Sequence, residues 1–226
     1  MSRRQVIEGI AIIDVVQKAL ESSLHDNGLP KGERTRAALV AAAIGRFATD
    51  GFVRTSVSTI ARDVHVTPGA PYRYFADKEA LFLAAVDADG VALIDLVRTT
   101  AFGRLDGSIR GLLGRLTDQL GAALDEHPLV ARVLSGAEPM GPERILALPN
   151  LAKLRAELTA MLQLGQQAGA VRDGVDPALL ALGLETAVLY QLAHIASLRD
   201  SGAGADRERW AALATLVEAA LQPCPR

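Results

Sequence analysis

Apolar residues recur every three to four positions along most of the chain, which is the spacing of one face of an α-helix. The first such stripe covers residues 2–26 and ends before Pro30. A second stripe covers residues 34–50, and Gly51 follows where helices commonly end with a left-handed glycine. Strand-like alternation never extends over a useful length, so the pattern predicts an all-α protein.

Two short helices with a tight turn between them come next. Either Thr55 or Ser56 can cap the first of them, which is predicted at residues 57–64. The turn falls at residues 65–66, and Thr67 is the predicted cap of the second helix. This is the layout of a helix-turn-helix, in which one helix braces another against DNA.

Longer helices make up the rest of the chain. Asp77 caps one that begins at residue 78 and is expected to continue toward residue 96. Asp176 and Pro177 are a cap and a first-turn proline for another. Five helices are predicted after residue 100, at about 107–125, 128–135, 143–168, 176–199 and 206–221. They indicate a larger helical domain after the helix-turn-helix.

The second short helix carries side chains suited to a DNA duplex. Arg73 can reach a base edge or a phosphate, while Tyr72 and Tyr74 can donate their hydroxyls to phosphate oxygens. Ser56, together with the N–H groups that follow it, and Lys78 each stand at a helix start where they can bind phosphate. Ordinary core packing of the tyrosines and a solvated Arg73 are the alternative interpretations.

The segment resembles the N-terminal DNA-binding domain of TetR/AcrR-family transcriptional regulators. The resemblance covers roughly residues 34–86 and rests on Gly51-Phe52, Thr55-Ser56, Ile60-Ala61, Val66-Thr67, Gly69, Tyr72, Tyr74-Phe75, Lys78 and Leu81. It implies DNA contacts for Ser56, Thr67, Gly69, Ala70, Tyr72, Arg73, Tyr74 and Lys78. It also implies an effector cavity in the larger helical domain that follows, which is called the body below. It further implies a homodimer formed through the helices at about 176–199 and 206–221. This homodimer would bind a palindromic operator in double-stranded DNA.

The chain departs from the family pattern at four places. His65 stands where the family usually has a turn glycine, and a left-handed non-glycine residue costs about 1 kcal/mol. Pro71 replaces an aliphatic residue, so we expect the regular helix to start late, with Gly69 as its cap and Pro71 in its first turn. Tyr74 stands where the family often has histidine. The helix at residues 2–26 precedes the usual start of the family.

These patterns divide the chain into an N-terminal extension helix at residues 1–30, a helix-turn-helix domain at residues 31–80 and an effector-binding and dimerisation domain at residues 81–226. The extension could pack on the DNA-binding domain or the dimer, order only on binding, or place Arg3 and Arg4 on DNA.

The charge distribution favours one DNA-facing module. Residues 31–80 hold eight lysines and arginines against five acidic residues, although the whole chain has a net charge of −2.

Polar side chains interrupt the apolar helix predicted at residues 176–199, namely Glu185, Thr186, Tyr190, Gln191 and His194. At helical spacing Thr186 shares a face with Tyr190, and Gln191 shares one with His194, so these four are candidates for an effector pocket. They could instead flank the dimer bundle or be satisfied polar groups of the core. Only four aromatic residues follow Lys78, so an aliphatic, uncharged effector fits better than a quaternary cation.

Enzymatic and metal chemistry has little support in the sequence. The four histidines are far apart and in no ligand spacing, and no nucleophile or nucleotide-binding motif is present, so neither a cofactor nor a metal is expected. The single Cys224 excludes a disulfide within the chain, and the absence of a signal peptide or a long apolar run favours the cytoplasm over a membrane.

The sequence thus predicts a homodimeric, DNA-binding repressor that a small, mainly apolar effector releases from its operator. The alternative is a constitutive DNA-binding module or an activator that engages a protein partner.

Overall fold

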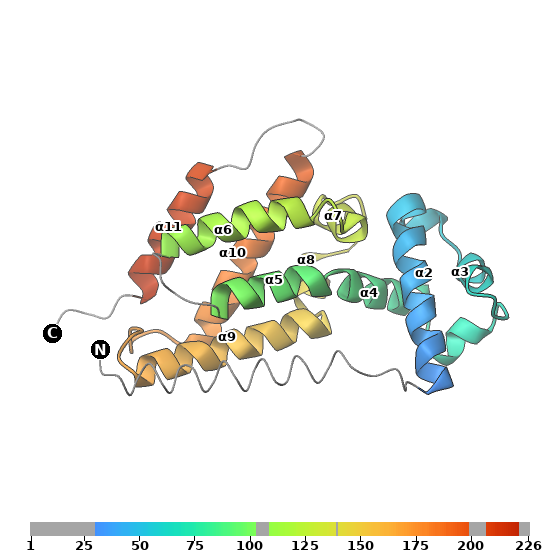
Figure 1. Ribbon diagram of the computed structural model, residues 1–226, viewed down its shortest axis with the longest axis horizontal. Coiled ribbons are helices and arrows are strands. Elements are labelled where there is room, and N and C mark those ends of the chain that lie inside the picture. The colour runs from blue at the N-terminus through green and yellow to red at the C-terminus, as the bar shows by residue number, and fades with distance from the viewer. Residues whose placement is uncertain (1–29, 103–108, 139, 199–206, 222–226) are drawn as a thin grey trace. The chain divides into compact units, whose positions relative to one another are not determined.

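The computed structural model describes residues 30–102, 109–138, 140–198 and 207–221. All regular elements in these ranges are helical, which confirms the all-α fold (Figure 1). The chain divides into two units, Met1–Ala38 and Leu39–Arg226. The helix predicted at residues 2–26 lies outside the described residues.

In chain order the elements are α2 (Lys31–Arg54), α3 (Val57–Asp63), the 3-10 turn η1 (Ala70–Arg73), α4 (Lys78–Asp89), α5 (Val91–Phe102), α6 (Ile109–Ala123), α7 (Pro128–Leu134), α8 (Pro142–Leu146), α9 (Pro149–Gln167), α10 (Pro177–Leu198) and α11 (Arg207–Leu221).

Two of the predicted helices are each divided in the structure. The helix predicted at residues 78–96 is α4 followed by α5, which meet at Gly90. The helix predicted at residues 143–168 is α8 followed by α9, because Leu148 is extended and Pro149 starts a new helix. The bounds predicted for α6, α7, α10 and α11 agree with the structure to within two residues.

Helix α2 is broken at Gly51, whose φ of 77° and ψ of 168° are not helical. The sequence correctly predicts a positive φ here, but ψ is extended rather than left-handed helical, a combination that is essentially restricted to glycine. Immediately after this break the N–H of Phe52 donates to the Glu138 carboxylate at 2.9 Å. Arg132 Nε donates to the same buried carboxylate at 2.8 Å, so the loop after α7 holds the end of α2.

Aromatic side chains form the centre of the core that α2, α3 and α4 share. Phe47 and Phe82 meet edge to face with their ring centroids 4.9 Å apart, and Phe52 lies 5.0 Å from Phe82. Ile60 of α3 and Leu81 of α4 are fully buried in the same cluster. Since Phe82 belongs to α4, this core fixes the start of α4 to the helix-turn-helix.

The far end of α4 is fixed to the body by two carboxylates. Asp87 accepts hydrogen bonds from the backbone N and from Nδ2 of Asn150, at 3.0 and 2.8 Å, near the start of α9. Asp89 accepts the backbone N–H of Val130 at 3.0 Å and lies 3.1 Å from His127 Nδ1, at the start of α7. Negative charge at helix N-termini is favourable, so these contacts hold α4, α7 and α9 together.

The body is a layered set of helices in which α10 packs against α9 and α7, while α6 packs against α5 and α11 (Figure 1). Its second core contains Leu93, Leu120, Leu124 and Trp210. By length and composition α10 could cross a membrane, and among the described residues it is the one helix with this property. In the structure, however, its neighbours are other helices of the body.

Candidate DNA interface and ligand cavity

Local hydrogen bonds shape the turn of the helix-turn-helix. Ser56 caps α3, and its Oγ accepts the N–H of Thr59 at 3.1 Å. After α3 ends, His65 takes a φ of 56°, and the next residue, Val66, donates its N–H to Ala61 O at 3.0 Å. The left-handed histidine predicted from the sequence is therefore confirmed, and the backbone bond that closes the turn holds it in place.

The element after the turn is one 3-10 turn, where the sequence predicts a short helix. Gly69 precedes it as the cap residue, and Pro71 lies in its first turn, which confirms the effect expected of Pro71. The missing N–H of a proline is tolerated there because first-turn N–H groups have no partner within the helix. The N–H groups of Tyr74 and Phe75 both point to the carbonyl of Pro71, at 2.9 and 3.0 Å, and end the element.

The residues that the resemblance implies for DNA contact are gathered in residues 56–78 and differ in exposure. Five of them are exposed, namely Ser56, Thr67, Gly69, Tyr72 and Arg73. Ala70, Tyr74 and Lys78 are partly buried, and Tyr74 packs against the core that α2, α3 and α4 share. Lys78 Nζ donates to Val53 O at 3.3 Å and lies 4.5 Å from the centroid of the Phe52 ring. Lys78 therefore supports the end of α2 as well as standing at the start of α4.

An ion pair fixes α3 on α2. Arg46 Nε and Nη2 donate to the two Asp63 carboxylate oxygens at 2.6 and 2.9 Å. This hydrogen bonding lowers the pKa of Asp63 below its ordinary range.

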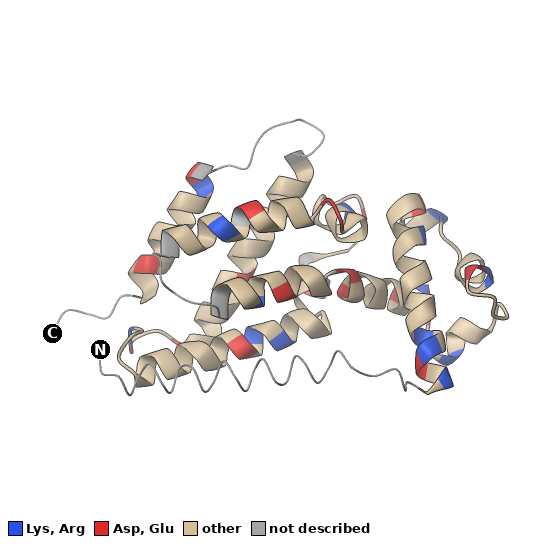
Figure 2. Ribbon diagram, in the orientation of Figure 1, with Lys and Arg blue, Asp and Glu red and all other residues tan. Residues whose placement is uncertain are grey.

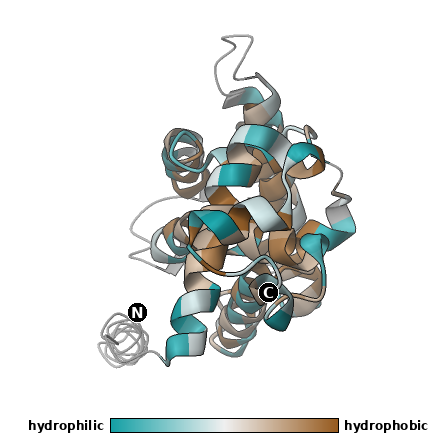
Figure 3. Cartoon of the chain, turned by 90° about the vertical axis from the view of Figure 1, so that its right-hand side faces the viewer, coloured by the Kyte–Doolittle hydropathy of each residue, from teal (hydrophilic) through white to brown (hydrophobic). Residues whose placement is uncertain are grey.

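Basic residues outnumber acidic ones between residues 54 and 78. The four basic residues are Arg54, Arg62, Arg73 and Lys78, and the two acidic residues are Asp63 and Asp77. Figure 2 shows the charged positions of this region. Figure 3 faces the side where α2 and α3 lie and shows hydrophilic segments toward the viewer, with more hydrophobic segments behind them.

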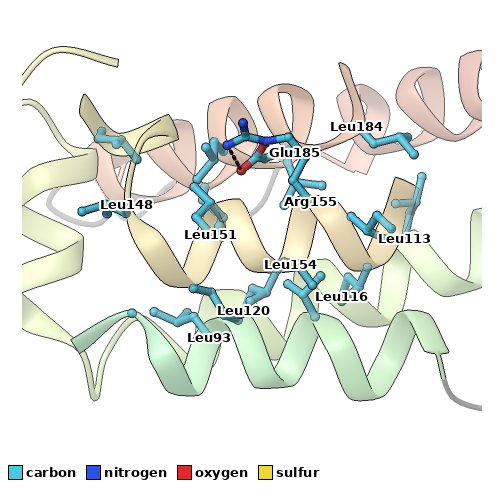
Figure 4. A pocket seen from close by; sticks show the side chains of 18 of the residues that line it. Leu93, Leu113, Leu116, Leu120, Leu148, Leu151, Leu154, Arg155, Leu184 and Glu185 are labelled. Carbon is cyan, nitrogen blue, oxygen red and sulfur yellow. Dashed lines mark hydrogen bonds and ion pairs between the residues drawn. The ribbon is translucent and has the colours of Figure 1, made fainter. Parts of the chain in front are cut away.

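The body contains a partly open cavity of about 470 Å³ among helices α4 to α11. Its lining is almost entirely aliphatic, and none of its described lining residues is aromatic. Figure 4 shows the leucine side chains that surround it, among them Leu93, Leu113, Leu116, Leu120 and Leu154. Cavities of this size and polarity are typical of sites for small organic ligands.

The charged residues of the cavity lining are Asp87, Arg155 and Glu185. Arg155 of α9 and Glu185 of α10 form a two-point ion pair at one wall, through Nε to Oε2 and through Nη2 to Oε1, the latter at 3.2 Å (Figure 4). Arg155 Nη2 also donates to the carbonyl of Leu146, the last residue of α8. The Glu185 side chain is only 4% exposed, so its charge depends on Arg155 for compensation.

Comparisons with known proteins agree with this architecture. A family model described as "Bacterial regulatory proteins, tetR family" matches residues 39–85. HTH-type transcriptional repressor Rv1474c of Mycobacterium tuberculosis is 31% identical over 175 residues, which cover 76% of this chain and 84% of that protein. This chain belongs to the TetR family. A second relative, the DNA-binding transcriptional repressor TetR of Mycobacteroides abscessus, is 30% identical over 139 residues, which cover 60% of this chain and 72% of that protein.

Solved structures share the fold of this TetR-family chain. A TetR-family regulator from Pectobacterium atrosepticum matches with a TM-score of 0.60 at 23% identity, over 87% of this chain and 98% of that chain. The regulator FadR from Bacillus subtilis, solved in complex with stearoyl-CoA, matches with a TM-score of 0.57 at 16% identity, over 82% of this chain and 99% of that chain. The family match and the sequence relatives make the protein a DNA-binding transcriptional regulator, and the solved structures share its helical fold.

The polar residues predicted for the effector pocket lie elsewhere on α10 of this TetR-family protein. Thr186, Tyr190 and Gln191 line a separate, open hollow together with Leu213 of α11, and His194 lines neither that hollow nor the aliphatic cavity. Tyr190 is 63% exposed, whereas Gln191 is buried. The residues of α10 that do line the cavity are Leu184, Glu185, Val188, Leu189 and Leu192. Helix α10 therefore presents apolar residues in two directions, and the sequence alone does not distinguish them.

Arg155 is the functional candidate that the sequence analysis missed. Its neighbours Leu151, Leu154, Leu158 and Leu162 follow helical spacing along α9 and line the cavity with it. An arginine on such a stripe must find a partner inside the fold, and that signal was available in the sequence.

Large apolar side chains also cover the outward side of α10 and α11. Leu179 is 68% exposed, Tyr190 63% and Leu216 69%, and Leu182 accompanies them. Leu179, Leu182 and Tyr190 line one hollow, and exposed apolar side chains grouped in this way commonly mark protein–protein contact surfaces.

Proposed function

We propose that this TetR-family regulator is a homodimeric, cytoplasmic repressor that a small, mainly apolar effector releases from a palindromic operator. The observation that carries this proposal is the aliphatic cavity of about 470 Å³, which lies beside the helix that leads to the DNA-binding module. A constitutive DNA-binding module would have no use for such a cavity, so its presence favours a ligand sensor. The alternative is a constitutive DNA-binding module or activator that engages a protein partner.

DNA binding is assigned to the exposed side of α3 and η1. Ser56, Thr67 and Tyr72 offer donors for phosphate oxygens, and the N-terminus of α3 adds its free N–H groups. Gly69 leaves room for close approach to the duplex, and Arg73 carries the long charged donor that suits a guanine edge or a phosphate. The Arg46–Asp63 pair keeps α3 in one orientation on α2, which a docked helix-turn-helix requires.

The connection from ligand to DNA is proposed to run through α4. Val86 and Asp87 of α4 and the following Gly90 line the cavity. Phe82 and Lys78, toward the start of α4, contact Phe52 of the DNA-binding module. A ligand that favours a different packing of α7 and α9 would shift the end of α4 through the Asp87 and Asp89 contacts. Such a shift would change the spacing of two recognition elements in a dimer. Coupling of this kind is typically worth about 1–3 kcal/mol.

Dimerisation is assigned to the outward sides of α10 and α11. Leu179, Tyr190 and Leu216 would be covered by the same helices of a second chain, in a four-helix arrangement with two-fold symmetry. The hollow that contains Thr186 and Gln191 would then lie at this interface. This is the dimer-flanking interpretation that the sequence leaves open for these residues.

The test is selection of bound sequences from a random duplex pool by wild-type protein, by Arg73→Ala and by Lys153→Ala. Lys153 is an exposed cation on α9 and serves as the matched control. We expect the wild type and Lys153→Ala to enrich one palindrome, and Arg73→Ala to bind it roughly 5- to 150-fold more weakly, as for the loss of about 1–3 kcal/mol. No enrichment, with only salt-sensitive general binding, would favour the partner-binding alternative.

A further inference from the structure

The aliphatic cavity contains one feature that its overall apolar character does not explain. Arg155 and Glu185 lie at its wall, although an aliphatic pair of similar size would be at least as stable in such surroundings. Both Glu185 oxygens accept hydrogen bonds from Arg155, so the carboxylate is fully paired. The pair therefore places a defined polar group at the wall without giving it a net charge.

The hydrogen bonds of the pair leave Arg155 with donors to spare. A guanidinium has five N–H groups. The hydrogen bonds described for Arg155 use Nε once and Nη2 twice, to Glu185 and to Leu146 O. The two N–H groups of Nη1 are thus available, among the described contacts, to a neutral acceptor such as a hydroxyl, ester or ketone oxygen.

A ligand carboxylate meets a different situation at the same wall. A carboxylate that accepts from Nη1 would lie beside a guanidinium whose charge Glu185 already neutralises, so two carboxylates would share one arginine at an apolar wall. Displacing Glu185 instead would leave a 4%-exposed carboxylate without its partner. Asp87, whose oxygens already accept two hydrogen bonds from Asn150, adds a further negative charge to the lining. The acid would otherwise have to enter in its protonated form, which is scarce at neutral pH.

We propose that the Arg155–Glu185 pair selects neutral aliphatic molecules with one hydrogen-bond acceptor and rejects the corresponding carboxylates. The proposal rests on the proposed function of the cavity as a ligand site and adds the chemical class of the ligand. Arg155 supplies the donor, Glu185 sets the charge that the ligand must not carry, and the leucines accept the hydrocarbon chain.

The experiment is isothermal titration calorimetry of the full chain with dodecanol, dodecanoate and dodecylamine, which share one hydrocarbon chain and differ in charge. The proteins are the wild type, Glu185→Gln and Glu157→Gln. Glu157 lies on α9 with Arg155, forms an ion pair with Arg98 and does not line the cavity, so it is the matched control. Glu185→Gln keeps Arg155 bonded to Leu146 O but removes the competing charge.

We expect the wild type to bind dodecanol at least about 30-fold more tightly than dodecanoate, which corresponds to about 2 kcal/mol. In Glu185→Gln this preference should fall by at least about tenfold, because Arg155 can then pair with the ligand acid. Glu157→Gln should keep the wild-type preference. Comparing this ratio between the variant and the wild type removes the intrinsic difference between the two ligands, as in a double-mutant cycle.

Two results overturn the proposal while leaving the cavity as a ligand site: equal or tighter binding of dodecanoate or dodecylamine by the wild type, or an unchanged ratio in Glu185→Gln. If none of the three compounds binds, the result contradicts the proposed ligand site itself.

Should Glu185→Gln fail to fold, Arg155→Gln gives the reciprocal test. That variant leaves Glu185 uncompensated, and its preference for dodecylamine over dodecanol should rise at least about tenfold.

Discussion

Gly51 is the position where a single methyl group is expected to do the most damage to the connection between the DNA-binding module and the body. Its φ of 77° and ψ of 168° lie in a region that side-chain-bearing residues rarely adopt. A Cβ placed there would lie 2.8 Å from Arg132 Nη2 and 2.9 Å from Glu138 Oε1. Gly51→Ala must therefore strain the backbone and also displace Arg132 and Glu138, whose carboxylate accepts the Phe52 N–H.

The size of the effect follows from these two contributions. Backbone strain in this region costs about 1–3 kcal/mol. Displacing the buried Glu138 carboxylate from its donors adds about 1–3 kcal/mol, since an unsatisfied buried acceptor loses its full solvation. Together the free energy of unfolding should fall by about 2–6 kcal/mol, which for a chain of this length is a drop of roughly 4–24 °C in Tm.

Gly45→Ala is the matched control for this prediction. Gly45 lies in the same helix, is exposed, and a Cβ there would meet nothing within 4 Å. Alanine should stabilise the helix at this position by about 0.5–1 kcal/mol. Thermal and urea melts followed by circular dichroism measure both variants. A Gly51→Ala protein that melts with the wild type would refute the assignment of strain and of the Glu138 contact.

Three further changes test other contacts. Arg46 lowers the pKa of Asp63, so the pair contributes its full stabilisation at pH values above the ordinary pKa of aspartate. This contribution is lost as the pH falls through the lowered pKa of Asp63. Asp63→Asn should therefore lower Tm at neutral pH but little in acid, and an unchanged Tm–pH profile would contradict this. If the proposed dimer forms through α10 and α11, Leu216→Asp should be a monomer in sedimentation velocity, whereas Leu164→Asp, at an exposed leucine of α9, should remain a dimer. Glu138→Gln should lower the free energy of unfolding by about 1–3 kcal/mol in urea melts, because Arg132 loses its carboxylate, and a wild-type urea midpoint would sink this reasoning.

Local sequence rules predicted most of the helices because their ends carry strong signals. Asp77 and Asp176 cap helices with their carboxylates, as predicted, and accept N–H groups at 2.7 and 2.8 Å respectively. The late start at Pro71 follows from the chemistry of proline, whereas the left-handed backbone at His65 was expected from the turn glycine of the resembled family. The division at Gly90 was missed because this glycine keeps helical angles, so its type gives no local signal. Pro149 does give such a signal, because proline is favoured at the first position of a helix and disfavours a helical residue before it.

The ligand cavity could not be predicted from the sequence because it depends on which face of α10 turns inward. Thr186 and Tyr190 interrupt one apolar face and Glu185 interrupts another, and all three looked equivalent along the chain. Packing against α9 turns Glu185 toward Arg155, thirty positions earlier in the sequence. Such a distant pairing is a property of the tertiary structure, and no periodicity within one helix reports it.

The central claim is that occupancy of the aliphatic cavity weakens DNA binding. Fluorescence anisotropy of the selected palindromic duplex, titrated with the protein at saturating dodecanol and without it, tests this most directly. The comparison protein is Leu154→Trp, which places a larger side chain at the buried lining of the cavity. We expect dodecanol to weaken wild-type binding roughly 5- to 150-fold, as for a coupling of about 1–3 kcal/mol, and to leave the DNA affinity of Leu154→Trp unchanged. An unchanged affinity of the wild type for the duplex, with dodecanol binding shown to be saturated, would contradict the claim.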